Sequence, residues 1–169
     1  MTAIRLRRFV PEDATALTEF LHRAYAELGA EGLNFTAVDQ SEATTLHRAS
    51  SGLCLLAEDD GELIGTATFA LPPSATIRRM FPAADRPDMA WLGQLGVDPA
   101  TRGAGVASAL WAEGLAWAVT EGARSIGVDT AIPATNLLSI YRGWGFEPAG
   151  EVHWEGKTYD SAVLLRPLP

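Results

Sequence analysis

Apolar residues recur along the chain with two spacings, and each spacing predicts one type of secondary structure. In residues 4–8 apolar and charged residues alternate, which predicts a first strand. Residues 11–28 begin with a proline and two acidic residues and then carry apolar residues three and four positions apart, which predicts a helix. Residues 29–40 have the composition of a loop, and a short helix is expected near 40–50.

The middle of the chain is rich in strand patterns. Residues 52–71 contain two apolar runs around an Asp-Asp-Gly turn, which predicts a hairpin. Residues 71–88 contain four prolines and no periodicity, which predicts a surface loop. Residues 89–97 form another apolar run, interrupted by Gly93 and Gly96. Because glycine weakens strand pairing, we expect a bulge or a close backbone approach at these glycines.

The second half adds a helix over 103–122 that is apolar on most faces and is therefore expected to be buried. A strand over 123–131, a short helix over 134–144 and a final hairpin over 147–168 follow. The predicted order is β-α-α-β-β-β-α-β-α-β-β. This order indicates a single domain over 1–169 in the α/β or α+β class, with a mixed sheet of about seven strands and helices on both faces.

Composition limits what the protein can do. A chain of 169 residues with 47% hydrophobic and 20% charged residues can bury a core within one domain. The net charge of −8 argues against nucleic acid as a partner, because binding phosphate backbones requires a basic face. No segment reaches the roughly 18 apolar residues of a membrane span, and the first residues lack a signal peptide pattern. We therefore expect a cytoplasmic protein that does not bind membranes.

The cysteine content excludes two kinds of site. Cys54 is the single cysteine, so no intramolecular disulfide and no cysteine-based metal site can form. Its leucine neighbours predict a buried strand residue with a structural role. We expect no metal site in the protein.

Residues 97–110, VDPATRGAGVASAL, join a strand to a helix and are candidates for a phosphate cradle. A helix N-terminus offers free N–H groups and the positive end of the helix dipole. Small residues in 103–107 leave room for a phosphate, and Arg102 adds a charged donor. The same small residues would also allow close packing of helix on sheet without any ligand. A dinucleotide fingerprint fits the segment poorly.

Two motifs in this half of the chain resemble the signatures of the GNAT-type N-acetyltransferase superfamily. The acyl-CoA-binding motif [Q/R]-x-x-G-x-[G/A] is met by Arg102, Gly105 and Ala107. A second motif, N-x-x-x-x-Y-x-x-x-G-F, is met by Asn136, Tyr141, Gly145 and Phe146. The predicted order of elements is also similar to that fold across nearly the whole chain.

The resemblance implies a mostly antiparallel, twisted sheet that splays open between its fourth and fifth strands and takes the pantetheine arm of acetyl-CoA there. The arm would pair with backbone groups of the fourth strand, and the amides of residues 102–107 would hold the pyrophosphate. Asn136 would cap its helix, bind the arm, or do both. The residues implied in cofactor binding are Leu95, Gly96, Val97, Arg102, Gly103, Ala104, Gly105, Val106, Ala107 and Asn136.

The resemblance makes Tyr141 the candidate general acid. Acyl transfer from a thioester to an amine expels a thiolate, which a positioned phenol can protonate. A phenol has a reference pKa near 10, so it carries its proton at neutral pH. A tyrosine at this helical position can also be a packing residue. The N–H of Leu95 is a candidate donor to the oxyanion that forms during transfer.

The general base is not defined by the motifs. The strand over 89–97 contains no acid, and Gln94 cannot act as a base. Asp129, Glu31 and His153 are candidates, each of which can equally be structural or solvated. Deprotonation through ordered water is a further route.

The acceptor is expected to contact residues 30–42 and the final hairpin. The acidic residues Glu27, Glu31, Asp39 and Glu42 favour a cationic amine, although a solvated acidic face explains them equally well. Phe35 is either a wall of the substrate site or a plug over the core.

The resulting hypothesis is an acetyltransferase that moves an acetyl group from acetyl-CoA to a primary amine, in a small molecule or peptide, by direct transfer in a ternary complex. A non-catalytic acyl-CoA-binding module and a nucleotide-binding domain are the alternatives. Homodimers are frequent in the family, so a homodimer stays open.

Overall fold

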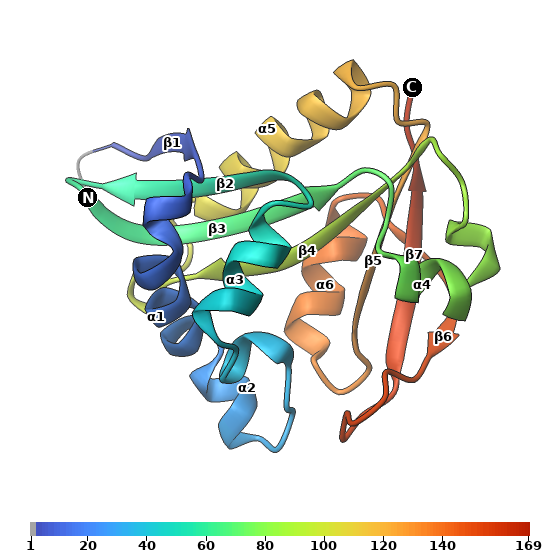
Figure 1. Ribbon diagram of the computed structural model, residues 1–169, viewed down its shortest axis with the longest axis horizontal. Helices are drawn as coiled ribbons and strands as arrows, with labels where there is room; N and C mark the ends of the chain where they lie inside the picture. The colour runs from blue at the N-terminus through green and yellow to red at the C-terminus, as the bar shows by residue number, and fades with distance from the viewer. Residues whose placement is uncertain (1–2) are drawn as a thin grey trace.

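Seven strands form one twisted sheet in the order β1-β2-β3-β4-β5-β7-β6, as Figure 1 shows for the computed structural model, which describes residues 3–169. The strands are β1 Arg5–Arg8, β2 Gly52–Asp59, β3 Glu62–Ala70, β4 Met89–Val97, β5 Ser125–Ala131, β6 Glu147–Val152 and β7 Ser161–Pro167. The pair β4–β5 is parallel and the other pairs in these residues are antiparallel. The predicted mixed, mostly antiparallel sheet is confirmed.

Helices cover both faces of the sheet, as predicted (Figure 1). The helices are α1 Ala14–Ala24, α2 Ala26–Ala30, α3 Glu42–Ala49, α4 Ala75–Met80, α5 Val106–Thr120 and α6 Thr135–Gly143. Added Cβ atoms show the two faces: at Gly96 a Cβ would contact Ala24 and Tyr25 near the end of α1, whereas at Gly65 it would contact Val106 and Leu110 of α5. One apolar cluster therefore lies under α1 and α3, and another under α5 and α6.

Close packing holds α5 against the sheet. A Cβ added at Gly114 would lie 2.0 Å from Cζ of Phe69, so only glycine allows the helix this near to β3. The ring of Phe69 is fully buried and lies 6.4 Å from that of Trp111 on the same helix. The buried character predicted for this helix is confirmed at its sheet-facing positions.

Three predicted boundaries are wrong. The helix expected over 11–28 is a turn at Pro11–Asp13 followed by α1 and α2, because the backbone leaves helical geometry at Tyr25. The helix expected from residue 103 begins at Val106. The loop expected over 71–88 contains α4. Ser74 is the N-cap of this helix, and its side chain accepts a hydrogen bond from the N–H of Ile77. Ile77 is buried, so this segment contributes to the core.

The sheet opens between β4 and β5, as predicted. Met89–Leu92 pair with Ser125–Val128, and the two strands diverge beyond these residues. The register between β3 and β4 also shifts at this point, between Thr66 and Thr68. The irregularity expected at the glycines lies between Gly93 and Gly96, where Gln94 adopts a positive φ of 51°.

Cys54 lies buried in β2, which confirms its predicted position in a strand. Within residues 3–169, the structure contains no helix that is long and apolar enough to cross a membrane.

Candidate active site

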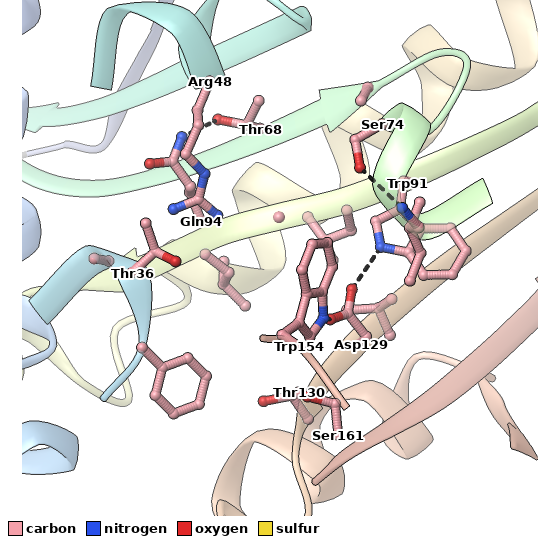
Figure 2. Close-up of a pocket in the computed structure, with 18 of the residues that line it drawn as sticks. Thr36, Arg48, Thr68, Ser74, Trp91, Gln94, Asp129, Thr130, Trp154 and Ser161 are labelled. Carbon is pink, nitrogen blue, oxygen red and sulfur yellow. Dashed lines mark hydrogen bonds between the residues drawn. The ribbon is translucent and has the colours of Figure 1, made fainter. Parts of the chain in front are cut away.

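A cavity of about 440 Å³ lies where β4 and β5 diverge. Its floor is formed by Leu92–Leu95 of β4, and Figure 2 shows residues of α3, β3 and β4 on one side and residues of β5 and β7 on the other. Residues 35–37 and the segment between β6 and β7 complete the walls. The two segments that were expected to meet the acceptor, the loop after α2 and the final hairpin, therefore both border this cavity.

Free backbone amides gather where β4 leads into α5. Gly103 and Gly105 adopt φ of 81° and 85°, and a Cβ at either position would contact nothing within 4 Å. Five backbone N–H groups have no hydrogen-bond acceptor among residues 3–169, those of Gly103, Gly105, Val106, Ala107 and Ser108. Unpaired donors at the positive end of a 15-residue helix suit a phosphate group, so the segment fits the pyrophosphate of a coenzyme A molecule.

Two residues of the predicted cradle have other partners. The N–H of Ala104 donates to the carbonyl of Thr101 at 3.3 Å. The guanidinium of Arg102 is exposed and forms an ion pair with Glu27 of α2 at 3.0 Å. The amide of Ala104 was expected to be free for the pyrophosphate, but it is already bonded. The side chain of Arg102 is paired with α2.

Val97 points its backbone groups into the gap between the strands. The N–H of Asp98 donates to the carbonyl of Ile64 at 2.9 Å, which makes these two residues a hydrogen-bonded antiparallel pair. The neighbouring pair of Val97 and Gly65 is then non-hydrogen-bonded, because the two types of pair alternate. The N–H and carbonyl of Val97 therefore point away from β3 and toward the side that β5 leaves open.

The backbone carbonyl of Leu95 is not free for the cofactor arm, contrary to what the resemblance implies. It accepts a hydrogen bond of 2.6 Å from the hydroxyl of Tyr25. Burial raises the pKa of Tyr25 to about 12, which keeps the hydroxyl in its donating form. Gly96 pairs with Thr66 of β3, and its Cα faces Tyr25.

Tyr141 of α6 lines the cavity and is 4% exposed. Its ring packs against those of Trp144 and Phe146, with 6.0 Å between centroids in each pair. Its hydroxyl has no hydrogen-bond partner among residues 3–169. Burial raises the pKa of Tyr141 well above its ordinary value of 10.0, so the phenol keeps its proton at neutral pH.

Asn136 does not cap its helix. The N-cap of α6 is Ala134, which makes no side-chain bond, and Asn136 lies exposed in the first turn. The capping role predicted for Asn136 is therefore wrong, and the predicted contact with the cofactor arm stays a prediction.

Asp129 of β5 is held between two tryptophans in the cavity wall (Figure 2). Its Oδ1 accepts a hydrogen bond of 2.8 Å from Nε1 of Trp91, and its Oδ2 accepts one of 2.7 Å from Nε1 of Trp154. Burial raises its pKa above the ordinary 3.8, and the two indole donors oppose this shift without cancelling it. A carboxylate of raised pKa is a better proton acceptor than an exposed one. Nearby, the buried hydroxyl of Thr130 has no partner among residues 3–169.

The other proposed bases lie outside the cavity lining. Glu31 is exposed at the end of α2, and His153 is exposed and paired with Asp160 at 2.9 Å. The acidic residues that were expected to attract a cation, Glu27, Glu31, Asp39 and Glu42, are likewise absent from the lining. Phe35 does line it, with its ring 5.4 Å from that of Tyr25 and 5.1 Å from that of Tyr159.

Sequence reasoning missed Arg48 of α3, which lines the cavity. One of its guanidinium nitrogens, Nη1, donates to Oε1 of Gln40 at 2.9 Å. Nε2 of Gln40 in turn donates to Oε1 of Gln94 at 2.9 Å and to Oγ1 of Thr45 at 2.8 Å. Burial lowers the pKa of Arg48. No motif marks this arginine, because its neighbours come from distant parts of the chain.

Lys157, between β6 and β7, is a second missed cation in the lining. Its Nζ donates to the carbonyl of Asn34 at 2.7 Å and to Oγ1 of Thr36 at 3.1 Å. Burial and the charge of Arg48 lower its pKa. Among residues 3–169, no three His, Cys, Asp or Glu side chains gather closely enough to hold a metal ion.

Comparison with known proteins adds to this geometry. Residues 15–146 match the model of the acetyltransferase (GNAT) family. The fold is similar to an N-acetyltransferase from Staphylococcus aureus Mu50, with a TM-score of 0.74, 20% identity and coverage of 99% of this chain and 100% of the other. It is also similar to the ribosomal-protein-S18-alanine N-acetyltransferase from Escherichia coli, with a TM-score of 0.74, 16% identity and coverage of 98% and 94%.

A third similar structure is yncA, an acetyltransferase from Salmonella typhimurium determined with its cofactor acetyl-CoA, with a TM-score of 0.73, 16% identity and coverage of 99% and 95%. No curated protein matches the chain. At these identities the likeness establishes the fold.

Proposed function

Because the chain belongs to the GNAT acetyltransferase family, we propose that it transfers an acetyl group from acetyl-CoA to a primary amine in one ternary complex. One observation carries the proposal. The gap between β4 and β5 has free amides at its α5 end, while Tyr141 and Asp129 line the cavity that continues it. The strand β4, whose residues 92–95 line the cavity together with these two groups able to move protons, therefore leads to the free amides.

The residues of the cradle would hold acetyl-CoA, which supplies the acetyl thioester. The free N–H groups of Gly103 and residues 105–108 would bind the pyrophosphate, and the backbone of Val97 would pair with the pantetheine arm. The carbonyl of Leu95 retains one lone pair beside the Tyr25 hydroxyl, so it can accept one further hydrogen bond. We keep the N–H of Leu95 as the proposed donor to the oxyanion.

Asp129 is the proposed general base. An ammonium acceptor must lose a proton before its nitrogen can attack the thioester carbonyl carbon. Each oxygen of Asp129 retains a lone pair beyond the indole bond that it accepts, so the carboxylate can take this proton directly or through water. The tryptophans fix its orientation, which is what a positioned base requires.

Tyr141 is the proposed general acid. When the carbon–sulfur bond breaks, the sulfur leaves as a thiolate and needs a proton. The buried phenol is protonated at neutral pH and its hydroxyl is not committed to another group among residues 3–169. It can therefore give its proton to the thiolate and regain one from solvent.

The test combines cofactor binding with turnover. Acetyl-CoA should raise the melting temperature, while ATP and NADH should not. An amine panel scored by free-thiol release should then identify an acceptor, and Tyr141→Phe should lower kcat by about 10²-fold, at the lower end of general acid catalysis, with the thermal shift unchanged.

Tyr159→Phe is the matched control, because it removes a phenol from another wall of the same cavity. Stabilisation by acetyl-CoA without thiol release from any amine would identify a non-catalytic binding module. Equal turnover by the Tyr141 and Tyr159 variants would remove Tyr141 as the acid.

A further inference from the structure

The ionisable groups of the cavity have an unexpected balance of charge. Asp129 is the one carboxylate in the lining described by the structure, whereas His47, Arg48 and Lys157 are basic. One carboxylate can offset the charge of only one of these basic groups. The protein as a whole carries a net charge of −8, so this local excess of basic groups is not a consequence of composition.

Arg48 is held in place without a carboxylate partner. Among residues 3–169, no Asp or Glu oxygen lies within 4.0 Å of its guanidinium. Its Nη1 donates to Gln40, and its other guanidinium nitrogens, which have no partner among residues 3–169, are not buried and are therefore accessible to solvent. A guanidinium has five donors in a planar fork that matches a carboxylate. The fixed side chain therefore offers donors suited to an anion.

We propose that the acceptor is a small amine that also carries a carboxylate, with Arg48 binding that carboxylate. This inference rests on the proposed function, because it assigns a substrate class to the same cavity. Arg48 comes from α3 and Asp129 from β5, on opposite sides of the cavity in Figure 2. A zwitterion can then place its carboxylate at Arg48 and its ammonium at Asp129.

The walls between the two charges suit an apolar body. Phe35, Trp91, Trp154 and Tyr159 all line the cavity. The volume of about 440 Å³ can hold a free amino acid with an apolar or aromatic side chain together with the acetyl end of the donor. Lys157, fixed by Asn34 and Thr36, adds a second positive charge.

The phosphates of the donor are not the partners of Arg48. Their proposed cradle lies at the N-terminus of α5, and α5 covers the face of the sheet opposite to α1 and α3. Arg48 instead reaches Gln40, which contacts Gln94 in the middle of β4. Arg48 therefore lies on the acceptor side of the strand.

Matched pairs of ligands test the proposal. Phenylalanine, leucine and methionine are each compared with their carboxamides, which keep the amine and the side chain and lose the negative charge. Thiol release in the presence of acetyl-CoA gives kcat and KM, and calorimetry on the protein saturated with coenzyme A gives binding without turnover. The variants are Arg48→Gln, Arg48→Lys and the control Arg5→Gln, which removes an exposed arginine on the edge strand β1.

The wild type and Arg5→Gln should prefer at least one amino acid over its carboxamide by about tenfold or more in KM and Kd, the range of a hydrogen bond to a charged group. Arg48→Gln should abolish this preference with kcat nearly unchanged, and Arg48→Lys should restore part of it. If Arg48 only supports the fold, Arg48→Gln would weaken the binding of the amino acid and of its carboxamide equally, and this result would overturn the proposal.

The proposal is also overturned if the wild type uses the carboxamides with the same kinetic constants as the amino acids. It is overturned as well if none of the amino acids binds. Binding of a carboxylate that depends on Arg48 without thiol release would support the anion site and refute the proposed transfer. The two failures are therefore distinguishable.

Discussion

Gly105 offers a direct test of the cofactor cradle, because the chain contains a matched glycine at the other end of the same helix. Gly105 precedes α5 with φ of 85°, and Gly122 follows it with φ of 88°. A Cβ at either position would meet nothing within 4 Å. Leucine at either site therefore imposes the same backbone strain without a clash, but only at Gly105 would it stand among the free amides.

The expected magnitudes follow from strain and linkage. Holding a leucine in the left-handed region costs about 1–2 kcal/mol, and 1 kcal/mol moves the melting temperature of a chain of this size by about 2–4 °C. Each variant should thus melt about 2–8 °C below the wild type. Acetyl-CoA at about 100 times its Kd stabilises by about 2.7 kcal/mol, a rise of about 5–11 °C.

The assay is thermal unfolding with and without acetyl-CoA. Gly122→Leu should keep the full ligand-induced rise from its lower starting point, while Gly105→Leu should lose most of it. Comparable rises in both variants would refute the cradle, because a side chain among the amides would then leave binding intact. Loss of the rise in both would show that general loosening of α5, rather than local obstruction, removes the ligand.

Further expectations concern the proton-transfer groups and their support. In a pH profile, kcat/KM should fall as pH decreases through a pKa above 3.8, because protonated Asp129 cannot act as a base. Asp129→Asn should lower the rate and remove this acidic limb of the profile. If the limb persists in the variant, it belongs to another group. Gly127→Ala should place a Cβ 2.1 Å from Cζ3 of Trp91, displacing the ring that orients Asp129, so kcat should fall while the acetyl-CoA thermal shift remains. An unchanged kcat would mean that the Trp91 bond is dispensable.

Local patterns predicted most of the fold. The apolar run in 89–97 and the apolar segment before Thr120 are local signals, and β4 and α5 follow them. The errors have local physical causes as well. Positive φ at Gly103 and Gly105 delays the start of α5, and the Ser74 cap with the buried Ile77 makes a helix in a segment where prolines hid the pattern.

The candidate site was predictable only where its residues lie within one motif. The cradle is a continuous segment, and Tyr141 lies at a fixed spacing from Gly145, so both could be found in the printed sequence. Arg48 and Lys157 carry no such mark, because the partners that fix them are supplied by other elements. The acidic residues pointed to a cationic acceptor, yet the cavity is lined by three basic side chains and one carboxylate.

The bulge in β4 connects the two sides of the site. The positive φ of Gln94 accompanies the shift in register, and the backbone beyond it at Val97 points into the gap proposed for the cofactor arm. The side chain of Gln94 accepts a hydrogen bond from Gln40, which also receives one from Arg48. The strained backbone that shapes the cofactor side is thus anchored by the polar network of the acceptor side. Removing Gln40 should therefore disturb both ligands, whereas removing Arg48 should disturb the acceptor alone.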